Sequence, residues 1–218
     1  MRHVMLFSLA LIAASPCFGQ SPNPFQSVPA PSVPAPVAKP RPARPPASEP
    51  DTAQPAPAPA AAQVSVEEAT KRAQEASNRK DYAEEARWWR VAADQGDAEG
   101  EMALGELYLR GMGVTQDYAE ALRWSQKSAA QGNGGAMVHL AFLYSQGYGV
   151  PKDYAQAVLW YRRMIPGSGN RGVFFYKIAE MYEEGGPNLP QDAAQARYWY
   201  QLAAQDGWQP AKDWLAKH

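Results

Sequence analysis

The chain has 218 residues, with 21 Lys and Arg against 22 Asp and Glu, and a formal net charge of −1. This balance gives no support to nucleic-acid binding driven by bulk charge. A single cysteine, Cys17, excludes a disulfide framework and a thiolate metal site. Of three histidines, only His139 lies inside the helices that we expect to form, so we predict no metal and no cofactor.

Residues 1–19 have the pattern of a secretory signal peptide. Arg2 precedes an apolar run, Val4–Ala14, which is too short to span a bilayer. Small residues at Cys17 and Gly19 predict cleavage after Gly19. Lipid attachment at Cys17 is the alternative, and the proline before this cysteine fits it poorly. We therefore expect a periplasmic or secreted protein.

Residues 20–63 form a linker rich in proline and alanine. Of the 20 prolines, 14 lie between Ser21 and Ala62. Such a composition has too little bulky apolar surface to offset the entropy lost on ordering. We expect a disordered, extended tether that reaches up to about 130 Å at roughly 3.1 Å per residue. Its PxxP matches, such as Pro42–Pro45, are expected by chance in this composition.

Residues 64–218 contain an internal repeat. Asp81, Asp117 and Asp153 are spaced by 36 residues, and Asp192 follows after 39. Aspartate is a favourable helix N-cap, and Glu or Gln three residues later predicts a capping box. A period of this length is typical of a helical solenoid. A tryptophan stands seven residues after each aspartate, and we expect it to pack between helix pairs: Trp88, Trp124, Trp160 and Trp199.

A second motif marks the first helix of each pair. One position always holds a small residue that lets a neighbouring helix approach closely: Gly105, Ala141 and Ala179. Glycine-containing loops at 111–114 and 147–150 then turn the chain. Val66–Asn78 is predicted to open the array and Pro210–Lys217 to close it. The pattern predicts an all-α solenoid of about four helix pairs over 64–218.

The run Leu104–Val114, followed by Asp117-Tyr118 and Trp124, resembles the Sel-one-like repeat, a relative of the tetratricopeptide repeats. The resemblance covers about residues 81–207. It implies an all-α fold, a right-handed α-α superhelix of antiparallel helix pairs, and, for many members, a scaffold role in protein–protein interaction. Some exported bacterial members act in secretion, envelope assembly or host contact, and some resemble immunity proteins. The chain departs from the pattern at Pro166–Gly172, where we expect a kink.

Motifs typical of enzymes occur without the context that they need. Residues 167–172 match GxGxxG, but they fall between two helices of a repeat instead of in a βαβ unit. Ser77–Lys80 matches SxxK without its companion motifs. Glu180, Glu183 and Glu184 could hold a cation, although a solvated helix face explains them better. We therefore predict no enzyme activity.

The concave surface of a solenoid is lined by the first helix of each pair. The tetratricopeptide pattern, carried over, places eight candidate partner-binding residues there: Met102, Glu106, Leu109, Val138, Phe142, Tyr176, Glu180 and Glu184. Aromatic anchors rimmed by charge are typical of protein interfaces, and the acids favour a partner segment with basic residues. The alternative is that these are ordinary, partly exposed side chains.

These observations together predict an exported, monomeric, non-catalytic scaffold that binds another envelope or exported protein, in the manner of an immunity-type or secretion-associated protein. Two alternatives stay open. One is an envelope protein that recognises a β-lactam or a glycan. The other is a structural module tied to the cell wall through the linker.

Overall fold

The computed structural model describes residues 64–165, 169 and 171–218. The predicted signal peptide and linker lie outside the described residues, as does most of the expected kink. Within the described part, the only β-structure is an isolated bridge between Gly186 and Leu189. All regular structure there is helical: α1 (Val66–Asn78), α2 (Tyr82–Asp94), α3 (Ala98–Arg110), α4 (Tyr118–Ala130), α5 (Gly134–Gln146), α6 (Tyr154–Met164), α7 (Arg171–Glu184), α8 (Ala193–Gln205) and α9 (Gln209–Leu215).

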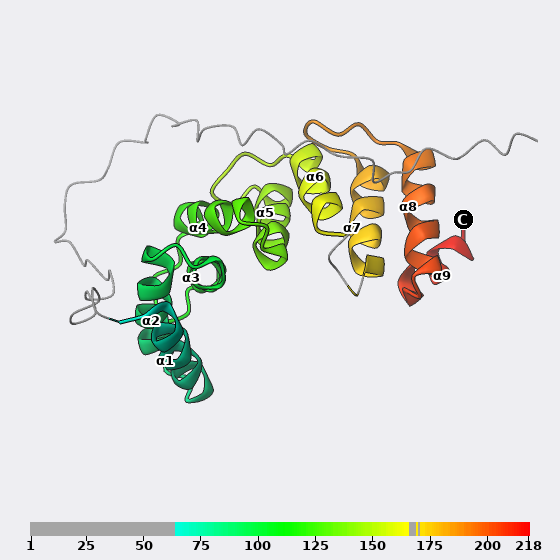
Figure 1. The fold of residues 1–218 in the computed structure, drawn as a ribbon. Coiled ribbons are helices and arrows are strands. Elements are labelled where there is room, and N and C mark those ends of the chain that lie inside the picture. Colours follow the sequence, from blue (N-terminus) through cyan, green and yellow to red (C-terminus); the bar gives the residue numbers. More distant parts are fainter. Residues whose placement is uncertain (1–63, 166–168, 170) are drawn as a thin grey trace, which may run out of the picture.

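The helices pack in chain order as α1–α2, α3–α4, α5–α6 and α7–α8, with α9 against α8. The pairs follow one another along a curved arc (Figure 1). Helices α3 and α5 also contact each other directly, so the first helices of these two pairs lie on the inner side of the curve. The predicted all-α solenoid of helix pairs is confirmed. None of the described helices is long and apolar enough to cross a membrane.

The repeated aspartates are the N-caps of the second helices, as predicted. For example, Asp117 Oδ1 accepts from the backbone N–H groups of Ala119 and Glu120 at 2.9 and 3.1 Å. The capping-box part of the prediction is wrong. The backbone N–H of Asp117 donates instead to the carbonyl of Tyr108 in the preceding helix, at 3.1 Å. Glu120 turns to the indole of Trp124, whose N–H donates to its Oε2 at 3.0 Å.

Each glycine loop connects the two helices of one pair and also contacts the preceding pair. A Cβ added at Gly113 would lie 1.9 Å from the carbonyl oxygen of Tyr82, and one at Gly149 would lie 2.6 Å from that of Tyr118. Each loop therefore rests on the first residue of the second helix of the preceding pair. This contact explains why an Asp-Tyr motif and a glycine loop recur at one common period.

Three of the repeated tryptophans fill the space between pairs, with exposed fractions of 2–3%: Trp124, Trp160 and Trp199. Trp88 is only half-buried, and the guanidinium of Arg72 lies 4.5 Å from its ring centroid. The difference follows from position, because only α1 precedes α2 in the described chain. The small residues at Gly105, Ala141 and Ala179 are buried as expected. A Cβ at Gly105 would lie 3.0 Å from the hydroxyl of Ser125 in α4.

Candidate partner-binding groove

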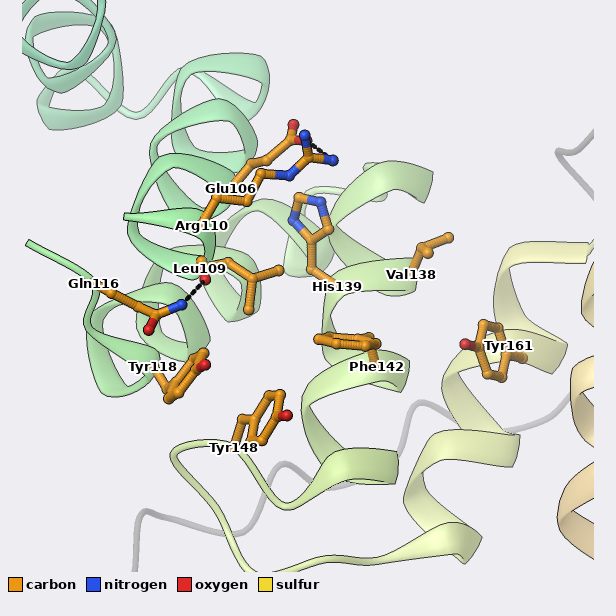
Figure 2. A pocket seen from close by; sticks show the side chains of 10 residues that line it. All are labelled: Glu106, Leu109, Arg110, Gln116, Tyr118, Val138, His139, Phe142, Tyr148 and Tyr161. Carbon is orange, nitrogen blue, oxygen red and sulfur yellow. Dashed lines mark hydrogen bonds and ion pairs between the residues drawn. The ribbon is translucent and has the colours of Figure 1, made fainter. Parts of the chain in front are cut away.

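A cavity of about 530 Å³ opens between α3 and α5. We call it the aromatic hollow (Figure 2), and the residues that line it are Glu106, Leu109, Arg110, Gln116, Tyr118, Val138, His139, Phe142, Tyr148 and Tyr161. A second cavity of about 240 Å³, the α7 hollow, is lined by Phe142, Ser145, Gln146, Tyr154, Tyr161, Lys177, Glu180, Met181 and Glu184. Phe142 and Tyr161 line both cavities, so the two hollows adjoin and form one groove.

Aromatic rings give the aromatic hollow its shape. The rings of Tyr118 and Tyr148 are stacked, with centroids 4.5 Å apart and planes 14° from parallel. Phe142 meets Tyr148 edge to face, at 5.8 Å and 69°. Phe142 and Tyr148 are 39% and 37% exposed, and among the described residues only Tyr198 is a comparably exposed large hydrophobic side chain. Solvent-exposed aromatic surface is thus concentrated at one hollow, which is typical of a binding site.

The repeat itself positions this aromatic cluster. Gly147 ends α5 at a φ of 77°, and Gly149 adopts a φ of 71°, a region that favours glycine. Because Gly149 rests on the start of α4, the loop carries Tyr148 over the ring of Tyr118. The equivalent loop of the preceding pair has Met112 at this position. The stacked tyrosine pair is therefore a local feature built on a repeated contact.

Charged and polar groups rim the groove. In the aromatic hollow, Arg110 Nη2 pairs with Glu106 Oε1 at 2.8 Å across one turn of α3. In the α7 hollow, Lys177 Nζ pairs with Glu180 Oε2 at 2.8 Å. The hydroxyl of Tyr154 donates to Glu184 Oε2, also at 2.8 Å. The two exposed ion pairs, Arg110–Glu106 and Lys177–Glu180, contribute only about 0–1 kcal/mol each, so a ligand can exchange their partners at small cost.

Two titratable side chains in the groove have shifted pKa values. Burial raises the pKa of Tyr161 to about 12, and the Glu180 carboxylate adds to the rise. Its hydroxyl, which Figure 2 shows on the side of the ring facing Phe142, therefore stays protonated and can donate. Burial lowers the pKa of His139, with Glu106 opposing the shift and Arg110 adding to it. His139 Nδ1 is buried and has no hydrogen-bond partner among the described residues.

Six of the eight residues predicted to bind a partner line the groove: Glu106, Leu109, Val138, Phe142, Glu180 and Glu184. The other two pack elsewhere. Met102 lies against Gly135, where an added Cβ would be 3.4 Å from its sulfur. Tyr176 meets the ring of Tyr200 edge to face at 5.2 Å.

Sequence reasoning missed the three tyrosines of the aromatic hollow. Tyr118 was interpreted only as part of the helix start, and Tyr148 only as part of a turn. Tyr161 occupies a repeat position held by Trp89 and Ser125 in the earlier pairs. Variation at a fixed repeat position is the signal that could have singled it out.

The acidic residues near the end of α7 do not converge on one point. Glu183 accepts from the hydroxyl of Tyr200, and its Oε1 accepts from the indole N–H of Trp214 at 3.0 Å. Glu180 and Glu184 face the α7 hollow instead. Across the described ranges, no group of three His, Cys, Asp or Glu side chains is placed to hold a metal ion.

The SxxK match forms the end of a helix. The backbone N–H of Lys80 donates to the carbonyl of Ser77 at 2.9 Å, and Lys80 has a φ of 61°. This is a turn between α1 and α2, outside the groove. The GxGxxG match lies mostly outside the described residues.

The fold and the groove define the class of protein: an α-solenoid of helix pairs with an open, aromatic inner surface. The Sel1 repeat matches the chain at residues 80–97, 98–133, 135–165 and 176–208, more than half of its length, and the chain belongs to this family. Sel1 repeats are generally non-catalytic scaffolds for protein interaction, and proteins built from them are often exported by bacteria.

Two solved structures have the same fold. One is c5321, described as a protective antigen present in uropathogenic Escherichia coli strains, at 30% identity and a TM-score of 0.62. The match covers 69% of this chain and 33% of c5321. The other is a Sel1 repeat protein from Oxalobacter formigenes, at 27% identity and a TM-score of 0.61, covering 70% of this chain and 63% of that one. The chain thus spans under two thirds of either protein. No curated protein matches it.

Proposed function

We propose that this protein is an exported, non-catalytic adaptor that binds an extended segment of another envelope or exported protein along the groove. The observation that carries the proposal is the position of Phe142. This residue is 39% exposed and lines both hollows. A free protein gains nothing by leaving such a ring in water, whereas a bound segment can cover it.

The two hollows suit different parts of one bound segment. The aromatic hollow offers ring faces and edges to apolar side chains, with Leu109 and Val138 as its aliphatic lining. The α7 hollow offers the carboxylates of Glu180 and Glu184 to a basic side chain. We therefore propose a segment with apolar residues followed or preceded by Lys or Arg. Aromatic anchors supply most of the affinity in such interfaces, and the charges set orientation.

Export is part of the proposal. The first 19 residues have the composition of a signal peptide, and Sel1 repeat proteins are often exported. The linker would then hold the solenoid away from a surface or partner, and an immunity-type or secretion-associated role fits a tethered adaptor.

A capture experiment tests the proposal. The parent chain and a Phe142→Ala/Tyr148→Ala variant are each used to capture proteins from an envelope extract. Tyr198→Ala is the matched control, because this ring is 38% exposed but lies on α8 outside both hollows. A protein retained by the parent and the control and lost by the double variant would support the proposal. If the double variant captures the same protein as the parent, with helicity intact in all three chains, the proposal is overturned.

A further inference from the structure

The aromatic hollow and one segment of the linker have matching chemistry. All the Lys and Arg residues between 20 and 63 fall in one stretch, Lys39–Pro46, which reads Lys-Pro-Arg-Pro-Ala-Arg-Pro-Pro. We propose that this segment docks in the aromatic hollow of its own chain and occupies the groove until a partner displaces it. The inference rests on the proposed function, because it assigns a competitor to the same groove.

The aromatic surface suits a proline-rich ligand. Proline-rich segments bind as preformed, left-handed polyproline helices by packing pyrrolidine rings between aromatic side chains. Phe142 and Tyr148 meet at 69°, so their faces form a corner open to solvent, and Tyr118 backs Tyr148 by stacking on it. Prolines have no N–H, so the backbone of the segment presents more carbonyl acceptors than N–H donors. The protonated Tyr161 hydroxyl is a donor within this hollow.

The segment is amphipathic in this conformation. A polyproline helix has three residues per turn, so residues three apart lie on the same edge. Arg41 and Arg44 then share one edge. A second edge, Pro40–Ala43–Pro46, is wholly apolar. An apolar edge can face the rings while the arginine edge faces carboxylates.

The segment Lys39–Pro46 and the solenoid have charges of opposite sign, because the segment carries three cations and no acid. Residues 64–218 contain 17 Lys and Arg and 20 Asp and Glu, a net charge of −3. Three of these acids lie on the groove: Glu106 in the aromatic hollow, and Glu180 and Glu184 in the α7 hollow. An arginine edge that runs from one hollow toward the other meets these carboxylates. Glu106 and Glu180 already pair with cations on their own helices, and those exposed pairs are weak enough to exchange.

The length of the intervening chain permits docking within one molecule. Residues 47–64 separate the segment from the N-cap of α1, and they can span up to about 55 Å at roughly 3.1 Å per residue. Four helix-to-helix steps of about 8–10 Å lead from α1 to α5, at most about 40 Å. Tethering gives the segment an effective concentration near the millimolar range, so even weak docking would populate the bound state. The apparent affinity for a partner is then the intrinsic affinity multiplied by the fraction of chains whose groove is free.

A paramagnetic label tests the proposal on the mature chain. If cleavage falls after Gly19, this chain has no cysteine, so Ala38→Cys can carry a single nitroxide next to the segment. We expect the methyl NMR signals of Leu109 and Val138, in the hollow, to lose intensity, and those of Leu202 on α8 to keep it. No selective loss at Leu109 and Val138 would overturn the proposal.

Two controls separate the causes of such a loss. Pro40→Ser/Arg41→Ser/Arg44→Ser/Pro46→Ser should restore the signals, whereas changes of two linker prolines outside the segment, Pro55→Ser/Pro57→Ser, should not. If the first variant still shows the signal loss at Leu109 and Val138, docking by this segment is refuted.

A second control distinguishes docking within one chain from docking between two copies. The nitroxide is placed on a chain without isotopes, which is mixed with an isotope-labelled, nitroxide-free chain. Signal loss in that mixture as large as within one chain would mean docking between copies, which contradicts the proposal.

The outcome is distinguishable from failure of the proposed function. If the segment does not dock but capture of a partner still depends on Phe142 and Tyr148, the adaptor role stands and this inference falls. If the segment docks and no partner is captured, the inference stands and the adaptor role falls.

Discussion

Gly113 lies where two successive helix pairs meet, and its replacement tests the repeat architecture. Its φ is 69°, and a Cβ added there would lie 1.9 Å from the carbonyl oxygen and 2.2 Å from the carbonyl carbon of Tyr82. Gly96 is the matched control, with a φ of 83° and nothing within 4 Å of an added Cβ. Both alanine variants strain a left-handed residue, but only Gly113→Ala forces the loop away from α2.

The expected costs follow from these geometries. The left-handed conformation costs a non-glycine residue roughly 1–2 kcal/mol. Replacing glycine with alanine also lowers the conformational entropy of the unfolded chain, which offsets about 0.4–1 kcal/mol of this cost. Gly96→Ala should therefore lower the free energy of unfolding by about 0–1.6 kcal/mol. Overpacking adds about 1–3 kcal/mol, so Gly113→Ala should lower it by about 1–4.6 kcal/mol.

Urea unfolding followed by far-UV circular dichroism measures the difference between the two variants. Repeat proteins can unfold in parts, so amide hydrogen exchange in the first turn of α2 is measured as well. We expect that turn to exchange faster in Gly113→Ala and to be unchanged in Gly96→Ala. Equal effects of the two substitutions would refute the proposed role of the loop in packing one helix pair against the preceding pair.

Three further predictions concern packing, capping and pH. Trp124→Ala should lower the free energy of unfolding by about 3–5 kcal/mol, and Trp88→Ala by clearly less. The reason is that Trp124 is 2% exposed whereas Trp88 is half-buried. Equal urea midpoints for the two variants would contradict this prediction. Asp192→Ala should cost about 1 kcal/mol, because Asp192 Oδ1 accepts from two N–H groups in the first turn of α8; an unchanged midpoint would show that water replaces the cap. Burial lowers the pKa of His139, so as the pH falls the imidazole is protonated in the unfolded chain before it is protonated in the folded one. The contribution of His139 to stability is therefore complete above about pH 6.5 and is lost below it. The melting temperature of a His139→Gln variant should therefore fall less than that of the parent on acidification below pH 6.5. Identical pH profiles would argue against a lowered pKa for this imidazole.

The fold could be predicted because its determinants lie close together in the sequence. The N-cap aspartates, the small helix-packing residues and the loop glycines all act on neighbouring elements, so one period of 36 residues reports them together. The opening helix was predicted as Val66–Asn78, and α1 has these bounds. The capping box was mistaken because the sequence does not reveal that a carbonyl of the preceding helix already holds the N–H of Asp117.

The groove could be predicted only in part. The tetratricopeptide pattern, carried over, predicted Phe142 and Leu109 on the concave surface, and both line the aromatic hollow. The stack of Tyr118 on Tyr148 joins residues 30 positions apart, and it depends on how closely Gly149 approaches α4. Tyr176 was expected in the groove, but the ring of Tyr200 in the next helix draws it aside. Such outcomes are decided by side chains of other units, which a repeat pattern does not specify.

A photo-crosslinking amino acid at position 148, in cells that make the mature protein, tests the groove most directly. The same amino acid at position 198 is the control, since Tyr148 and Tyr198 are 37% and 38% exposed. Adducts with another envelope or exported protein at position 148, and not at 198, are the predicted result. Adducts that form equally at both positions, or only at 198, would contradict a binding role for the groove.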